Sequence, residues 1–297
     1  MAWEFEPVAG PYQGPAGGLA WDGEGMLFSL VGEGRIMRYD PGSGAATEFR
    51  KYTNRTNGLA LSSSGRVYGC QAGSRRMISF DPDGSASLLA ERLDGRFHNY
   101  PKDLVVDKQG RIWFSDPYSS IPNVGPQLQG PLEHASVLRQ EQLRNRDWVI
   151  KRMTYDTAAP SGIALSRDES MLFVSENDEA PIGRRELRAY PIRDDGSLGP
   201  YRVLHTFGSD HRGPQRGIEG MCLDADGNVV ACAGWQQSGP GPMIYVFEPS
   251  GRVVETHPFP ADLPVNCRFG DADRGTLYVT TSGGQLYRVR SSGLKGS

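Results

Sequence analysis

The sequence predicts an all-β protein that folds as a six-bladed β-propeller, closed by the N-terminal strand in the last blade. Three observations predict it: a strand–turn–strand unit recurs six times, its copies begin about 40 to 60 residues apart, and further strand signals lie between them. Radial repetition of such units leaves only short, protected sheet edges. A β-sandwich array is the alternative, but it does not explain the constant spacing inside each copy.

Each copy begins with a short apolar strand, as in Asn57–Leu61, and passes through a polar turn into a second strand, as in Ile112–Phe114. Both strands are rich in residues that favour β-structure. The copies begin at Gly17, Asn57, Lys102, Ser161, Glu219 and Asn266. Eight residues after these positions stand Gly25, Gly65, Gly110, Glu169, Gly227 and Arg274. Glycine at one offset in four copies indicates that the same turn is repeated.

Further strands are predicted between the copies, which gives each repeat about four strands. They are Ile36–Asp40, Met77–Asp81, Leu187–Tyr190 and Ile244–Phe247. The sixth copy is too short for four strands, so we expect the strand Trp3–Val8 to complete it and close the ring. Residues 1–292 are therefore predicted to form one propeller domain, and residues 293–297 a flexible tail.

Composition excludes several classes of function. The 297 residues carry a formal charge of only −3, which is no basis for electrostatic binding of nucleic acid. We find no run of 18 apolar residues and no signal-like start, so we expect a cytoplasmic protein without membrane contact. The four cysteines form no CxxC pair, which predicts free buried thiols. The oligomeric state is left open.

The first strand of each propeller blade lines the central channel, so the six starting residues are predicted to form a ring. Five of the six are polar, although each opens an apolar strand. Such a ring either binds a ligand or lines a water-filled channel whose polar groups satisfy one another. Only five residues of this chain are lysine, which makes Lys102 at a ring position a notable choice.

Long, uneven connections locate the binding face. The connections that join the other ends of the strands are longer than the turns, and long loops on a rigid scaffold commonly carry binding sites. Among them are 94–101, 116–133 and 206–218. We expect their polar and aromatic side chains to roof a pocket for a small-molecule substrate. The candidates are His98, Tyr100, Tyr118, His211 and Trp235, together with the ring residues Asn57, Ser161 and Asn266.

With these residues identified, the chain resembles the senescence marker protein/gluconolactonase/luciferin-regenerating-enzyme family of six-bladed propellers. The most similar stretches are Asn57–Leu61, Asp103–Val106 with Ile112–Tyr118, and Ser161–Ser166 with Leu172–Ser175. The resemblance implies hydrolysis of lactones or related esters, with one divalent cation held in the channel.

The ring departs from that family's usual ligands. The family typically has Glu in the first blade, Asn in the third and fourth, and Asp in the fifth, where this chain has Gly17, Lys102, Ser161 and Glu219. A hard cation needs several oxygen ligands with negative charge, and an ammonium group repels it. We therefore expect no metal and no other cofactor, with the Lys102 ammonium near the metal's place and Glu219 as its counter-ion. The alternative is one divalent cation, such as Ca, Zn, Mn or Fe, in a rebuilt site.

Lys102 and Glu219 are the predicted catalytic residues. A charged Lys102 suits a substrate carboxylate or a developing oxyanion, whereas a neutral one suits a base or a Schiff base. Glu219 is a candidate acid or base. The pair also has a purely structural interpretation, as a salt bridge that replaced a lost metal.

Three hypotheses remain open. The first is metal-independent hydrolysis, isomerisation or lyase chemistry on a small cyclic or carbonyl-bearing substrate. The second is a metal-dependent lactonase that uses Glu219, Asn57 and Asn266. The third is a non-catalytic propeller that binds a small molecule or a protein.

Overall fold

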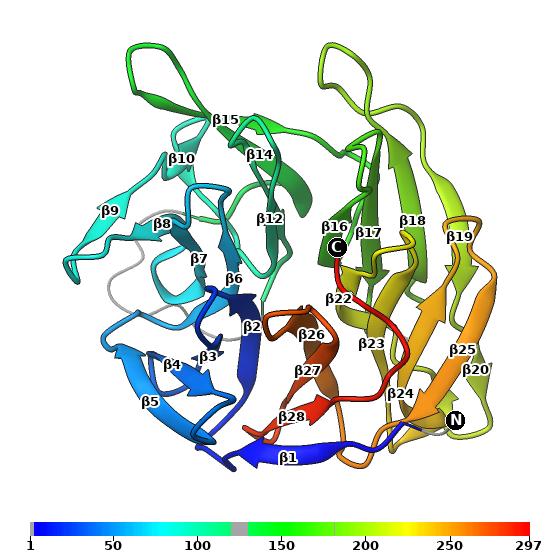
Figure 1. Cartoon of the computed structure of the whole chain (residues 1–297). Helices are drawn as coiled ribbons and strands as arrows, with labels where there is room; N and C mark the ends of the chain where they lie inside the picture. The colour runs from blue at the N-terminus through cyan, green and yellow to red at the C-terminus, as the bar shows by residue number, and fades with distance from the viewer. Residues whose placement is uncertain (1–2, 120–129, 181) are drawn as a thin grey trace.

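Six four-stranded antiparallel sheets stand around a central axis in the computed structural model, which describes residues 3–119, 130–180 and 182–297 (Figure 1). The first three blades are β2 (Ala16–Trp21), β3 (Met26–Leu30), β4 (Arg35–Asp40) and β5 (Ala45–Arg50); β6 (Thr56–Leu61), β7 (Val67–Gln71), β8 (Arg76–Phe80) and β9 (Ala86–Leu88); and β12 (Leu104–Val106), β13 (Ile112–Asp116), β14 (Ser136–Gln142) and β15 (Trp148–Arg152).

The remaining blades follow the same order, with the first strand of each innermost. They are β16 (Pro160–Leu165), β17 (Met171–Asn177), β18 (Arg185–Pro191) and β19 (Arg202–Thr206); β22 (Ile218–Leu223), β23 (Val229–Trp235), β24 (Ser238–Phe247) and β25 (Val253–Pro258); and β26 (Pro264–Gly270), β27 (Thr276–Thr281), β28 (Leu286–Val289) and β1 (Glu6–Ala9). Short additions are the ribbons β10 (Arg92–Leu93) with β11 (Arg96–Phe97) and β20 (Ser209–Asp210) with β21 (Gly213–Pro214), and the 3-10 turn η1 (Ala72–Ser74). The six-bladed propeller is confirmed.

The repeated turn is also confirmed. It joins the first two strands of each blade. In the second to sixth blades its closing N–H donates to the carbonyl three residues earlier, as from Gly65 to Ser62 and from Gly227 to Asp224. In the first blade the Gly25 N–H donates instead to Oδ1 of Asp22. Gly65 and Gly227 have φ values of 77° and 86°, in the left-handed region that glycine adopts without steric cost. Arg274 closes the sixth turn with a φ of 56°.

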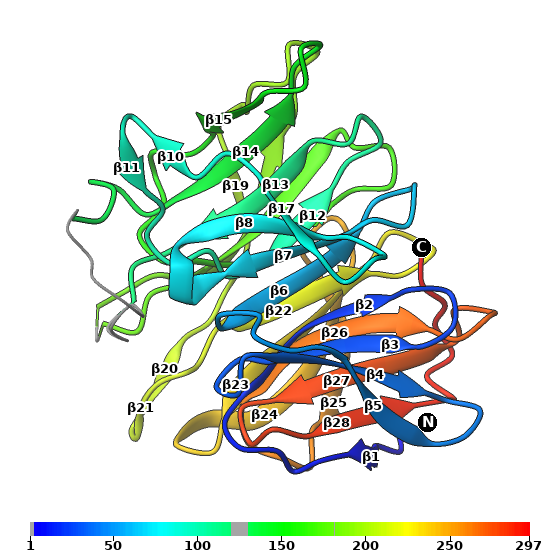
Figure 2. The same ribbon diagram turned by 90° about the vertical axis from the view of Figure 1, so that its left-hand side faces the viewer.

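Glycines beside the channel let neighbouring inner strands approach closely. A Cβ on Gly58 would lie 2.7 Å from the carbonyl oxygen of Lys102, and one on Gly220 would lie 2.6 Å from that of Val265. Figure 2 shows the inner strands β2 and β26 side by side, at the junction of the first and last blades. The small residues of the repeat thus set how tightly the blades pack around the axis.

Apolar side chains fill the space between blades. Phe173 of the fourth blade packs in one cluster with Met221 of the fifth, and Val230 of the fifth packs in another with Phe269 of the sixth. All four are buried. These clusters hold the sheets rigidly, so that residues at the ends of the inner strands keep fixed positions.

The ring closes through the N-terminal strand, as predicted. β1 pairs antiparallel with β28, and the Arg288 guanidinium binds the Glu6 carboxylate, with an Nε–Oε2 distance of 2.7 Å. The strand begins at Glu6 rather than at Trp3, whose ring instead stacks on His257 with a centroid distance of 3.8 Å. The closure therefore joins residues that are 282 positions apart.

The C-terminal segment is docked, contrary to the flexible tail expected for residues 293–297. The Gly296 N–H donates to the Arg274 carbonyl at 2.8 Å, and the Ala225 N–H donates to the Lys295 carbonyl at 2.6 Å. Leu294 packs against the apolar cluster between the last two blades. Backbone pairing and apolar burial both hold this segment on the propeller.

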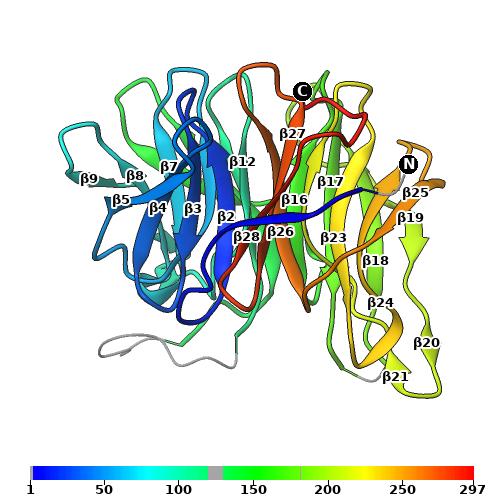
Figure 3. The same cartoon turned by 60° about the horizontal axis from the view of Figure 1, so that its bottom comes forward.

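The two faces of the ring differ. In Figure 3 the C-terminus lies at one face, with the short turns, whereas β20 and β21 lie at the other. The predicted long connection 116–133 runs partly through residues 120–129, which lie outside the described residues. Within the described ranges, no helix has the length and apolar character to cross a bilayer.

Candidate active site

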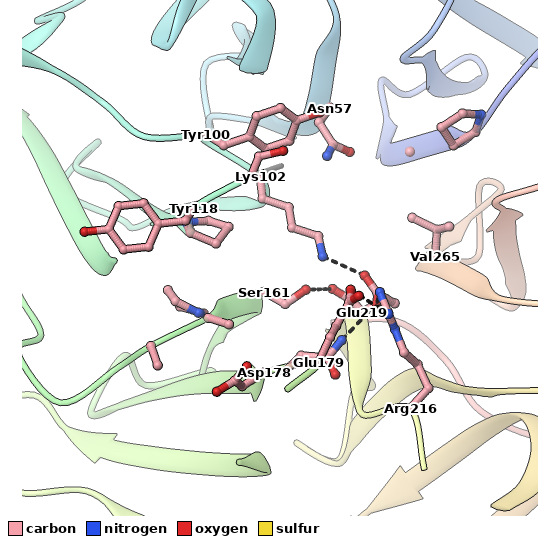
Figure 4. Close-up of a pocket in the computed structure, with 18 of the residues that line it drawn as sticks. Asn57, Tyr100, Lys102, Tyr118, Ser161, Asp178, Glu179, Arg216, Glu219 and Val265 are labelled. Carbon is pink, nitrogen blue, oxygen red and sulfur yellow. Dashed lines mark hydrogen bonds and ion pairs between the residues drawn. The ribbon is translucent and has the colours of Figure 1, made fainter. Parts of the chain in front are cut away.

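A cavity of about 610 Å³ opens on the long-loop face, where the inner strands begin. Its floor is formed by ring residues, and its walls by residues that follow the second strands of the third and fourth blades, including Tyr118 and Asp178. Figure 4 shows these side chains around one space. The predicted binding face therefore carries a cavity at the channel axis.

Lys102 and Glu219 meet on the floor of this cavity. Nζ of Lys102 donates to Oε2 of Glu219 at 2.6 Å (Figure 4). The Glu219 side chain is 8% exposed and that of Lys102 is 23% exposed. The ammonium therefore keeps a face toward the cavity, while the carboxylate lies beneath it.

Three basic or amide groups surround the Glu219 carboxylate. Besides Lys102, the Asn177 side-chain amide donates to Oε1 at 2.8 Å, and Nε of Arg216 donates to the same oxygen at 2.6 Å. Burial raises the pKa of Glu219, but the charges and hydrogen bonds of Lys102 and Arg216 outweigh burial and lower this pKa to about 2. Glu219 is therefore ionised at neutral pH, and its two oxygens face Lys102 on one side and Arg216 on the other.

Arg216 links the floor to the rim. Its guanidinium binds Glu179 as well as Glu219, with an Nη1–Oε1 distance of 2.6 Å to Glu179. The guanidinium carbon lies 5.5 Å from the centre of the Trp235 ring. Trp235, predicted to bind substrate, lies beside Arg216 and does not line the cavity; its indole N–H donates to Ser238 Oγ at 2.6 Å.

Four other predicted binding residues do line the cavity: Asn57, Tyr100, Tyr118 and Ser161. The Ser161 hydroxyl donates to the Glu219 carbonyl at 2.8 Å, and no histidine lines the described part of the cavity, so Ser161 has no base to activate it. Tyr118 is half-exposed at the rim, where its hydroxyl donates to the Leu132 carbonyl at 2.9 Å.

The sixth ring position is occupied by Val265, which corrects the assignment of Asn266. The register shift in β26 follows Pro264, which pairs with Thr281 as Ile218 pairs with Ala233 in the fifth blade. Val265 is therefore the equivalent of Glu219, and it lines the cavity. Asn266 lies one residue further along the strand, where its amide donates to Oδ1 of Asp103 at 3.3 Å. The sequence signal was the proline before the ring position, in Pro101, Pro160 and Pro264.

Neither predicted histidine reaches the cavity. The His98 ring is fully buried against Phe114, with a centroid distance of 5.1 Å, and burial lowers its pKa to about 3. Its carbonyl accepts a hydrogen bond from Arg75. His211 lies exposed between β20 and β21. His98 is thus a neutral core residue, and His211 is a residue of a protruding ribbon.

The sequence reasoning missed Asn177, Asp178 and Arg216, which all line the cavity. Asn177 ends the second strand of its blade, and Arg216 lies two residues before an inner strand. These positions lie outside the repeated unit, so their neighbours in sequence gave no signal. Glu219 pairs with two positively charged side chains, Lys102 and Arg216. A search for a second partner of Glu219 is the one approach that would have pointed to Arg216.

The residues present do not fit a divalent cation. No three His, Cys, Asp or Glu side chains of the described residues are grouped as a metal site requires. The oxygens of Glu219 accept hydrogen bonds from Lys102, Asn177 and Arg216, whose charges oppose a cation. In the first blade, a Cβ on Gly17 would lie 2.6 Å from Oδ1 of Asn57, so the Asn57 side chain fills the space of a ligand there.

Comparisons with known proteins agree with this fold. The sequence model of the "SMP-30/Gluconolactonase/LRE-like region" matches residues 15–283. A gluconolactonase of Zymomonas mobilis is 27% identical over 240 residues, which are 80% of this chain and 63% of that protein. The chain thus spans less than two thirds of that relative's length.

Solved structures extend the similarity over almost the whole chain. A gluconolactonase from Xanthomonas campestris has 28% identity and a TM-score of 0.79, covering 97% of this chain and 89% of the other. A luciferin-regenerating enzyme has 20% identity and a TM-score of 0.77, covering 99% of this chain and 97% of the other. At this identity the similarity is evidence for the fold alone. Together with the match over residues 15–283, this establishes that the chain belongs to the SMP-30/gluconolactonase/LRE-like family.

Proposed function

We propose that this chain hydrolyses a small lactone or related cyclic ester, and that the Lys102 ammonium takes the role of electrophile without a metal ion. The observation that carries the proposal is the 2.6 Å contact between Lys102 Nζ and Glu219 Oε2 on the floor of the cavity. The names of the relatives, gluconolactonases, support the class of substrate.

Lys102 is suited to polarise a carbonyl group. Glu219 accepts one N–H of the ammonium, which leaves two further N–H donors, and part of the side chain is exposed toward the cavity. A positive charge placed where the carbonyl oxygen becomes an oxyanion lowers the barrier to attack, and removing one such donor typically costs about 10²- to 10³-fold in kcat.

Glu219 acts as a positioning residue in this proposal. A carboxyl group with a pKa of about 2 carries no proton to donate at neutral pH, and it is a weak base. Its two oxygens instead fix Lys102 on one side and Arg216 on the other. The proposal therefore assigns proton transfer to another group.

Asp178 is the group that we assign as base. It lines the same cavity half-buried, and its carboxylate forms no ion pair within the described residues, where it accepts the Ala180 N–H at 3.0 Å. Asp178 would take a proton from water as the water oxygen bonds to the carbonyl carbon. The ring C–O bond then breaks, the ring oxygen takes up that proton, and a hydroxy acid leaves.

The test is acid release from a panel of sugar and aliphatic lactones, measured with enzyme that has been dialysed against EDTA. We expect turnover of at least one lactone, a loss of about 10²-fold or more in Lys102→Met, and full activity in the matched surface variant Lys108→Met. Asp178→Asn is expected to lower kcat with little change in KM. Activity that survives in Lys102→Met, or that requires added metal, would overturn the proposal.

A further inference from the structure

A second cavity, of about 470 Å³, lies at the opposite mouth of the channel, among the short turns. Ala20, Ala60 and Val105 form an apolar wall, and Ser62 and Ser63 supply hydroxyl groups. Tight turns are all that the repeat requires at this face, so the repeat does not explain why a cavity of this size is present.

Two arginines line this cavity, Arg268 from β26 and Arg274 from the following turn. Throughout residues 3–119, 130–180 and 182–297, neither guanidinium has a salt-bridge or hydrogen-bond partner. The other cavity differs, because its arginine, Arg216, binds two carboxylates. Burial and the like charge of Arg268 both lower the pKa of Arg274.

The carboxylates near this mouth are engaged elsewhere. Asp22 lines the cavity, but it forms an ion pair with Arg38, and its Oδ1 accepts the N–H groups of Glu24 and Gly25. Asp103 lies deeper and is buried, with hydrogen bonds from Ile163 N–H and from Asn266. Burial raises the pKa of Asp103 to about 6 although the charge of Arg268 lowers it, so Asp103 is a weak counter-charge to Arg268 and does not itself line the cavity. The two guanidinium groups therefore leave an excess of positive charge at the cavity wall.

The sixth turn places Arg274 at the cavity. Arg274 occupies the turn position that Gly65, Gly110 and Gly227 occupy in other blades, and its φ of 56° lies in the left-handed region, as does the φ of 59° of Glu169 at the same position of the fourth blade. A residue with a Cβ adopts this conformation at a cost of about 1 kcal/mol or more. Of these two strained residues, Arg274 is the one that lines the cavity.

We propose that this second cavity binds a small organic anion, a carboxylate or a phosphate monoester. Its charged group would lie between Arg268 and Arg274, which are suited to bidentate pairing with oxyanions, and its carbon skeleton would pack against Ala20, Ala60 and Val105. An anion here relieves the repulsion between the two guanidinium groups. The site is distinct from the Lys102 cavity, so its ligand binds without competing for the lactone site.

The test is isothermal titration with benzoate, phenyl phosphate and inorganic phosphate, at constant ionic strength set with sodium chloride. Benzyl alcohol is the uncharged comparison. We expect saturable binding of at least one aromatic anion and none of benzyl alcohol. Benzoate and phenyl phosphate distinguish a carboxylate from a phosphate ligand, and inorganic phosphate shows what the apolar wall adds.

Variants decide where the anion binds. Arg268→Gln and Arg274→Gly are each expected to weaken binding at least about tenfold, the loss of one charge-assisted pair. Arg274→Gly suits the left-handed turn, so its melting temperature should not fall. Arg202→Gln removes an exposed outer-strand charge and Lys102→Met alters the other cavity; both should bind normally. No saturable binding of any anion, or unchanged binding in Arg268→Gln and Arg274→Gly, would overturn the proposal.

Discussion

Nζ of Lys102 lies 2.6 Å from Oε2 of Glu219, although 117 residues separate them in the sequence. The contact bridges the third and fifth blades across the channel axis. Asn177 and Arg216 complete the shell around the carboxylate. Because three side chains share one buried anion, substitutions among these four residues should be strongly coupled.

A double-mutant cycle should reveal this coupling. Lys102→Met and Glu219→Gln each remove one partner of the pair, and the group left behind loses a charged hydrogen bond. We expect the free energy of unfolding of the double variant to be higher than the sum of the two losses implies, by about 1–3 kcal/mol. Urea denaturation of the four proteins measures it. Additive losses would show that the two side chains do not interact in solution.

Glu219 should make stability depend on acid pH. Its pKa in the folded protein is about 2, against 4.5 for the unperturbed group, so its stabilising effect is complete above about pH 4.5 and is lost as the pH falls toward 2. Each pKa unit corresponds to about 1.4 kcal/mol, so the stability advantage of the wild type over Glu219→Gln should shrink by about 3 kcal/mol over that range. Denaturation at pH 6, 4 and 2.5 tests this; a constant difference would contradict it.

Metal removal should have no effect. The oxygens of Glu219 are held by cationic and amide donors, and the described residues offer no cluster of metal ligands. We expect less than one equivalent of Ca, Zn, Mn or Fe by mass spectrometry after incubation with each ion and desalting. The melting temperature should be the same with and without EDTA. One tightly held ion per chain would show that the shell around Glu219 rearranges to admit it.

The glycines of the inner strands should be intolerant of a methyl group. A Cβ at position 220 would lie 2.6 Å from the Val265 carbonyl oxygen, and both backbones are fixed by their sheets. Gly220→Ala is expected to lower the free energy of unfolding by about 1–3 kcal/mol, the typical cost of overpacking. Gly208→Ala is the matched control, because a Cβ there meets no atom within 4 Å. Equal stability of the two variants would show that the blades can separate slightly at the axis.

The repeat explains why the fold could be predicted and why parts of the site could not. Lys102, Asn57, Ser161 and Glu219 occupy one repeated position, and the propeller geometry brings them to one cavity. The sixth ring position was predicted one residue too late, at Asn266 instead of Val265, because β26 has seven residues before its turn where β22 has six. His98 and His211 were chosen for residue type and loop position, neither of which fixes the direction of a side chain. Arg216 escaped notice because no other blade repeats it.

The pairing of β1 with β28 has a consequence for how the chain is made. The first strand leaves the ribosome long before its partner exists, and it must stay unpaired while five blades are synthesised. Joining ends 282 residues apart costs about 5 kcal/mol in chain entropy. Until then, β28 and the opening segment are bare sheet edges, each able to pair with another chain. In the finished ring, β1 covers the edge of β28. During synthesis, β1 is therefore the segment that most needs a chaperone to prevent pairing with other chains.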